Sequence, residues 1–128
     1  MTRSLLKQLK YKSFAAKSGA VVAITGAIDL VADAEKCYVI RNGCPEMSRI
    51  TGTGCQLSGI ATAYVVANPD NKTEAVAAAV CVMGLAGEIG LANMAEGEGN
   101  SSLRNRIIDA IYNMDAETLN KGAKYEVR

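Results

Sequence analysis

The spacing of apolar residues predicts two elements at the start of the chain. Leucines, a phenylalanine and alanines recur among lysines over residues 5–17, which predicts a moderately amphipathic helix that ends at Ser18-Gly19. A short, continuous apolar run follows over residues 20–24 and is typical of a strand covered on both faces. Thr25-Gly26 then lies at the carboxyl end of that strand, where open α/β sheets hold ligands.

Two further strands are expected over residues 28–31 and 36–41. Asp33-Ala34-Glu35 would join them, and the turn signal Asn42-Gly43 would close the pair. The strand over residues 20–24 has no parallel neighbour before it, so its edge would be apolar and unpaired. The pattern begins as if in the middle of an α/β fold, and we therefore expect Met1 to be an internal or engineered start.

Helical patterns fill the second half of the chain. The first covers residues 56–67, and the turn residues 68–71 end it. A second helix is expected over about residues 72–95, and an amphipathic third over residues 103–114. Residues after Lys121 are expected to be frayed.

The second of these helices is unusual in its small residues and its single charge. Gly84, Gly87 and Gly90 recur at intervals of three, although a glycine inside a helix costs about 1 kcal/mol. Two interpretations stay open, namely tight packing against a neighbouring element and close approach of a ligand. Glu88 is the only charge over residues 75–95, a stretch long enough to cross a membrane. Because a central Glu is costly in lipid, we expect a helix buried inside a soluble protein.

The most informative motif is Thr51-Gly52-Thr53-Gly54-Cys55, at the entrance of the first of these helices. Its two glycines let backbone N–H groups point outward together, and the first turn of a helix leaves such groups unpaired. The turn is therefore suited to an anion such as phosphate, and Cys55 lies where the same field favours a thiolate. A Gly-rich strand-to-helix junction with a packed cysteine is the alternative, and the motif alone leaves both interpretations open.

Composition argues against several classes of function. Fourteen basic and thirteen acidic residues give a formal charge of +1, and aromatic residues are few, so no nucleic-acid or membrane partner is expected. The chain has no histidine, which excludes histidine-based catalysis and most catalytic zinc sites. The four cysteines form no Cys-x-x-Cys pair, and no signal peptide is apparent. We expect a single cytoplasmic unit over residues 1–128 with reduced thiols.

The apolar run that ends in Thr25-Gly26, Asp29 in the next strand and the motif over residues 51–55 together resemble hydroxyethylthiazole kinase, of the ribokinase-like superfamily. Leu85-Ala86-Gly87-Glu88 and residues 108–112 fit the same family. The resemblance covers essentially the whole chain but only the carboxyl-terminal half of the family's length. It implies an α/β, ribokinase-like three-layer fold, of which this chain is the carboxyl-terminal, ATP-side part.

The family phosphorylates the hydroxyl of 4-methyl-5-(2-hydroxyethyl)thiazole with ATP and Mg²⁺ in thiamine salvage, and the resemblance implies the same kinase activity here. It implies that Thr25 contacts ATP and that Cys55 is the catalytic base near the hydroxyl of this small heteroaromatic alcohol. Gly52 would lie on the thiazole side, and Gly52, Thr53 and Gly54 would supply the anion hole for the transferred phosphoryl group. A homo-oligomer, specifically a trimer with sites at subunit interfaces, is also implied.

The resemblance places the magnesium-organising acidic residues in the family's amino-terminal half, so no metal ligands are expected in this chain and the 128 residues alone would be inactive. Asp29, Asp33 and Glu88 are not expected to form a compact acidic cluster. Two other hypotheses stay open. The first is a non-catalytic, nucleotide-binding remnant or accessory subunit of the same fold. The second is a cysteine-based redox or hydrolytic enzyme, which the lack of histidine weakens. A side chain at Gly54 is expected to be strained by unusual backbone angles there.

Overall fold

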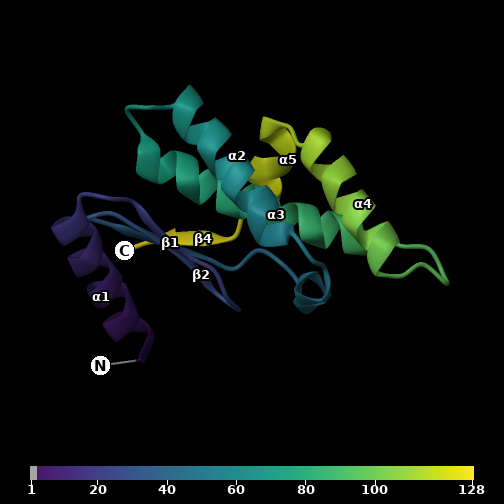
Figure 1. Cartoon of the computed structure of the whole chain (residues 1–128), viewed down its shortest axis with the longest axis horizontal. Coiled ribbons are helices and arrows are strands. Elements are labelled where there is room, and N and C mark those ends of the chain that lie inside the picture. Colours follow the sequence, from purple (N-terminus) through teal and green to yellow (C-terminus); the bar gives the residue numbers. More distant parts are fainter. Residues whose placement is uncertain (1–2) are drawn as a thin grey trace.

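A small antiparallel sheet lies between two helical layers in the computed structural model, which describes residues 3–128 (Figure 1). Its strands are β1 (Val22–Ile24), β2 (Asp29–Ala32), β3 (Cys37–Ile40) and β4 (Tyr125–Val127), side by side in that order. Each strand is antiparallel to its neighbour. Helix α1 (Arg3–Ser18) covers one face of the sheet, and the remaining helices lie on the other.

The second helical layer is built around α3 (Lys72–Ala92). Helices α2 (Thr53–Ala67) and α4 (Asn100–Tyr112) pack along α3, and the short α5 (Ala116–Gly122) contacts it as well. A 3-10 helix, η1 (Pro45–Arg49), connects the sheet to α2. Helix α3 therefore contacts every other helix of its layer and also strands β2 and β3.

The alternation of side chains along β2 and β3 explains why the sheet is covered on both faces. One set of buried side chains points toward α1 and Tyr11, namely Leu30, Ala32, Cys37 and Val39. The opposite set packs against Ala77, Val80 and Cys81 of α3 and consists of Val31 and Ile40. These two apolar interfaces confirm the predicted α/β class and its three layers.

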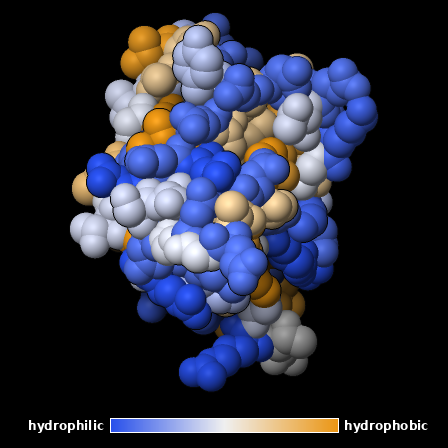
Figure 2. Space-filling view, turned by 90° about the vertical axis from the view of Figure 1, so that its right-hand side faces the viewer, coloured by the Kyte–Doolittle hydropathy of each residue, from blue (hydrophilic) through white to orange (hydrophobic). Residues whose placement is uncertain are grey.

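Helix α3 has the length and hydropathy of a membrane-spanning helix, and it is the helix expected from sequence to be buried instead. The structure buries 67% of its most apolar stretch among other elements. Buried side chains face in several directions around it, as expected of a helix enclosed by protein. On the face of the molecule shown in Figure 2, hydrophilic residues predominate and apolar residues form small, separate spots.

The predicted strand over residues 20–24 differs from the strand that forms. Strand β1 is limited to Val22–Ile24, and its side chains are exposed or half-buried rather than covered on both faces. The reason is its place at the edge of the sheet, where β2 is its only strand neighbour among the described residues. A continuous apolar run indicates a strand that can be buried, but it does not supply the neighbour that would bury it.

Three further predictions need correction. The end of the chain is not frayed, because residues after Lys121 complete α5 and then form β4, which pairs with β3. Asn42-Gly43 does not close a strand pair but leads the chain away from the sheet into η1, with φ of 111° at Gly43. Helix α2 begins at Thr53 rather than at Gln56, so the last three residues of the Gly-rich motif belong to the helix and its first two precede it.

The glycines of α3 are explained by close packing. A Cβ added at Gly84 would lie 2.7 Å from the backbone carbon of Asn42, and one at Gly87 would lie 2.1 Å from the Sδ atom of Met47. A Cβ at Gly90 would lie 3.1 Å from Ile107 of α4. The first two glycines admit the loop that follows β3, and the third admits α4. The interpretation that the three glycines of α3 serve tight packing against neighbouring elements is therefore confirmed.

We expect Gly84→Ala to lower the free energy of unfolding by about 1–3 kcal/mol, because the added methyl group meets backbone atoms that cannot rotate away. The matched control is Gly59→Ala in α2, where a Cβ has no neighbour within 4 Å. That control is expected to be neutral or to gain up to about 1 kcal/mol from helix propensity. Urea unfolding of the two variants measures both values, and equal stability would contradict the packing account.

Candidate functional site

A cavity of about 540 Å³ opens where four segments of the chain converge. The turn between β1 and β2 forms one wall, the loop after β3 and η1 form another, and α2 contributes its first turn. The middle of α3 forms the floor, with Val80, Met83 and Gly84. Most of the lining is apolar or backbone, and the polar groups come from the turn, the loop and the start of α2.

The turn between β1 and β2 presents Thr25 and Gly26 to the cavity. Its shape is held by Asp29, whose Oδ1 atom accepts a hydrogen bond of 2.9 Å from the Gly26 N–H. Asp29 is half-buried and also lines the cavity. Burial raises the pKa of its carboxyl group, and the hydrogen bond from Gly26 opposes that shift. This turn therefore brings a hydroxyl, a backbone segment and a carboxylate to one wall.

The first turn of α2 forms the opposite polar wall. Gly52 precedes the helix with φ of 95° and ψ of 0°, and no side chain caps the helix there. The Gln56 N–H makes the first backbone hydrogen bond of the helix, to the Gly52 carbonyl oxygen at 3.0 Å. The preceding N–H groups, of residues 53–55, have no acceptor within the helix, because an α-helix provides none for its first turn. Thr53 and Gly54 line the cavity, so this wall carries the partial positive charge of a helix start.

The structure places the candidate residues from the sequence in two groups. Thr25, Thr53 and Gly54 line the same cavity, although they come from distant parts of the chain. Gly52 and Cys55 flank this group and are not among the residues that line it. Cys55 is on the first turn of α2, as predicted, and is exposed.

The other cysteines differ from Cys55 in their surroundings. Cys44 lines the cavity and is half-buried, and burial raises the pKa of its thiol. Cys37 and Cys81 are buried in the two interfaces of the sheet, and burial raises the pKa of Cys81 to about 11. All four cysteines are free thiols. Cys55 is the one exposed cysteine, whereas Cys44 is the one that lines the cavity.

A side chain would be strained at Gly52 rather than at Gly54, contrary to the prediction from sequence. Gly52 has a left-handed backbone, which side chains rarely adopt, whereas Gly54 is an ordinary helical residue without positive φ. A Cβ added at Gly54 would meet no atom within 4 Å. Glycine adopts this conformation at little steric cost, and it stands at the position just before the helix.

A polar network around the half-buried Glu88 holds the loop wall of the cavity, and sequence reasoning missed it. The Oε1 atom of Glu88 in α3 accepts hydrogen bonds from the Gly43 N–H at 2.8 Å and from the Asn42 side-chain amide at 3.1 Å. Its Oε2 atom pairs with the Lys124 ammonium at 2.9 Å. Burial works to raise the pKa of Glu88, but these partners outweigh it and hold the pKa below its usual value. The one signal in the sequence was a lone charge in an apolar helix.

The described residues of the cavity do not form a magnesium site by themselves. Asp29 is the one carboxylate among the residues that line the cavity, and its Oδ1 atom is engaged by the Gly26 N–H. Within residues 3–128, no three acidic, cysteine or histidine side chains lie close enough together to hold a metal ion. Mg²⁺ prefers an octahedron of oxygen ligands, so further carboxylates, phosphates or waters would be required.

Comparison with known proteins identifies hydroxyethylthiazole kinases among the relatives of this chain. Residues 4–117 match the hydroxyethylthiazole kinase family. A hydroxyethylthiazole kinase from Clostridium acetobutylicum is 52% identical over 115 residues, which are 90% of this chain and 42% of that protein. A hydroxyethylthiazole kinase from Arabidopsis thaliana is 43% identical over 110 residues, which are 86% of this chain and 39% of that protein.

The fold has a match among solved structures. A hydroxyethylthiazole kinase protein from Pyrococcus horikoshii OT3 superposes with a TM-score of 0.84 at 24% identity, over 98% of this chain and 47% of that one. At this identity the superposition shows a shared fold. The chain thus spans less than half the length of these relatives.

Substitutions at Gly52 and Gly54 distinguish the residue whose backbone conformation requires glycine from the residue that faces the cavity. We expect Gly52→Ala to lower the free energy of unfolding by about 1–2 kcal/mol, because alanine is strained at φ of 95°. Gly54→Ala should leave stability unchanged or raise it slightly, since its Cβ would lie in open space within a helix. Chemical unfolding measures both, and a larger loss at Gly54 than at Gly52 would contradict the geometry.

Proposed function

Because the chain belongs to the hydroxyethylthiazole kinase family, we propose that it is the ATP-side part of an enzyme that phosphorylates 4-methyl-5-(2-hydroxyethyl)thiazole. The observation that carries the proposal is the cavity whose one wall is the uncapped start of α2 and whose other is the turn at Thr25. Phosphoryl transfer requires positioning and charge stabilisation more than covalent chemistry by the protein. A helix start beside a cavity provides such stabilisation.

In this proposal the two walls hold the phosphates of ATP. The N–H groups of residues 53–55 are directed at the transferred phosphoryl group, whose negative charge they stabilise. Thr25, on the opposite wall, donates its hydroxyl to a nucleotide phosphate. The open space at Gly54 supports this arrangement, because it leaves room for a phosphoryl group against the backbone.

Cys55 and Gly52 are proposed to serve the alcohol. Cys55 is exposed and lies one residue beyond the cavity lining, so the alcohol would approach from outside the described walls. In the proposed transfer the sulfur of Cys55 accepts the hydroxyl proton while the hydroxyl oxygen attacks the γ-phosphorus of ATP and the bond to the leaving ADP breaks, and Cys55 also orients the hydroxyl. Gly52, at the turn before the helix, leaves space for the thiazole ring because it carries no side chain.

The reaction needs groups that this chain does not supply. Mg²⁺ accompanies ATP in such transfers, and the cavity offers a single carboxylate. We propose that the remaining ligands, and the rest of the alcohol pocket, come from the part of the family's length that this chain does not span. We also propose a trimeric assembly and a cytoplasmic location, and the four free thiols support the latter.

The first test joins the chain to the part of the 52% identical relative that it does not match. We expect the joined protein to phosphorylate the thiazole alcohol in the presence of ATP and Mg²⁺, and the 128-residue chain alone to have no such activity. Phosphorylated thiazole is measured by mass spectrometry. Robust activity of the isolated chain, with its intact mass confirmed, would overturn the proposed division of the site. A well-folded joined protein that binds ATP but never transfers phosphate would favour a non-catalytic, nucleotide-binding role.

The second test concerns Cys55 in the joined protein. We expect Cys55→Ala to lower kcat about a hundredfold or more, with little change in the affinity for ATP, because one positioned proton acceptor is lost. Cys37→Ala is the matched control, because its buried thiol lies in the interface between the sheet and α1 and is not among the residues that line the cavity. Unchanged kcat in Cys55→Ala would remove this residue from the proposed mechanism.

A further inference from the structure

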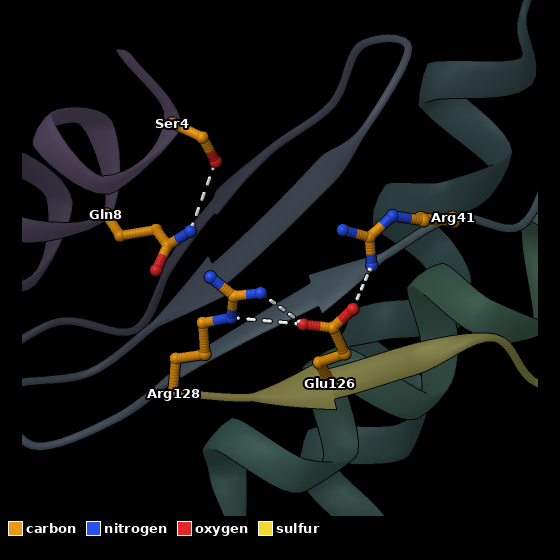
Figure 3. Close-up of polar contacts among 5 residues, drawn as sticks. All are labelled: Ser4, Gln8, Arg41, Glu126 and Arg128. Carbon is orange, nitrogen blue, oxygen red and sulfur yellow. Dashed lines mark hydrogen bonds and ion pairs between the residues drawn. The ribbon is translucent and has the colours of Figure 1, made fainter. Parts of the chain in front are cut away.

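The last seven residues of the chain lie beyond the segment that matches the family, yet they are attached to the wall of the cavity. Cys37 and Arg128 exchange backbone hydrogen bonds of 2.7 and 2.9 Å, and the Arg41 N–H donates to the Lys124 carbonyl oxygen at 2.8 Å. Figure 3 shows how the carboxylate of Glu126 lies between the guanidinium groups of Arg41 and Arg128. The segment over residues 122–128, here called the strap, thus follows β3 along its whole length.

The first residues of the strap contact Asn42, which is the first residue of the loop wall. Asn42 is only 7% exposed, and its side-chain amide donates to the Gly122 carbonyl oxygen at 2.9 Å. Its Oδ1 atom accepts the Lys124 N–H at 2.8 Å. The same amide also reaches Glu88, which in turn pairs with the Lys124 ammonium. All the donor and acceptor groups of the Asn42 side chain are therefore engaged, and two of the three bonds go to the strap.

Close contact with α3 fixes where the strap can lie. A Cβ added at Gly122 would lie 2.6 Å from the methyl groups of Leu85, one turn before Glu88. The strap itself buries little, because all three residues of β4 are exposed. Its apolar contribution to the core is small, apart from the ring contact of Tyr125 with Tyr38 at 5.9 Å. Most of the hydrogen bonds of the strap are made to β3 and to Asn42.

From these contacts we infer that the strap positions the cavity, with Lys124 as the positioning residue whose ammonium acts through Glu88 on Asn42 and Gly43. Both of these residues line the cavity, and the loop they begin continues through Cys44 and η1 to the first turn of α2. A displacement of Asn42 would therefore change the distance between the two polar walls. Only the benefit of the strap to ATP binding rests on the proposed function. The position of the loop can be measured without any reaction.

The test uses Cys44 as a reporter of the loop wall. In a Cys55→Ser background, Lys124→Met should raise the rate at which an aromatic disulfide reagent modifies Cys44 by about two- to fivefold, as expected for loss of a partly exposed ion pair. Lys121→Met is the matched control, because Lys121 pairs with Glu117 on the exposed side of α5. Removal of residues 124–128 should produce a larger increase.

Two internal controls separate positioning from a loss of stability. Cys37 and Cys81 are buried in the sheet interfaces and should remain protected in Lys124→Met. Equal acceleration at all three cysteines would mean global opening and would overturn the inference, as would an unchanged rate at Cys44 in both the substituted and the shortened chain.

A kinetic measurement then tests the purpose of the strap. In the joined kinase, Lys124→Met should raise the KM for ATP by about two- to fivefold, in line with the change at Cys44, and leave kcat nearly unchanged. Unaltered KM with a faster Cys44 would contradict a role in positioning the site. A joined protein without activity but with a responsive Cys44 would count against the proposed function, while the positioning of the loop by the strap would stand.

Discussion

The close approach of the loop after β3 to the backbone of α3 is the contact on which the rest of the structure depends. It is possible only because Gly84 and Gly87 carry no side chains where Asn42 and Met47 come against the helix. A methyl group at Gly84 would overlap the Asn42 backbone. Protein interiors are packed too tightly to absorb such an overlap without moving one element. The two glycines lower the helix propensity of α3, but they allow the loop to pack directly against its backbone.

A single half-buried charge makes this contact specific. Packing against glycine would allow the loop to slide along α3, but the carboxylate of Glu88 binds the N–H of Gly43 and the amide of Asn42 at defined places. A carboxylate inside an apolar helix is costly unless it is paired and hydrogen-bonded, and Lys124 supplies the opposite charge. The carboxyl-terminal end of the chain thereby contributes to the geometry of a cavity formed by residues far earlier in the sequence.

Much of the fold could be predicted from local patterns, and the exceptions have a common cause. Helices α1 to α4 and the three early strands follow from apolar spacing and turn residues, although α2 begins at Thr53 rather than at Gln56 and the short α5 was not predicted. The exposure of β1 and the pairing of β4 depend on which strands are neighbours, which spacing along the chain does not encode. The pattern at Tyr125–Val127 is three residues long, too short to be distinguished from a frayed end.

The residues of the candidate site likewise divide into those that local patterns predict and those that depend on long-range contacts. Thr25, Thr53 and Gly54 were accessible to sequence reasoning because each lies at the end or start of an element, where ligands are commonly bound. Asn42 and Lys124 were not, because their roles arise from hydrogen bonds that span 46 and 82 residues of sequence. The lone charge of Glu88 gave a signal, but only the fold shows what it binds.

The most direct test of this account is a titration of the joined kinase with ATP, followed through the backbone amide signals of the chain. The account predicts that the amides of residues 53–55 shift together with those of Thr25 and Gly26, because phosphate lies between the two polar walls of the cavity. Shifts confined to the smaller cavity of about 230 Å³ between Tyr38, Tyr125 and α5 would contradict it, since ATP would then be bound away from the start of α2.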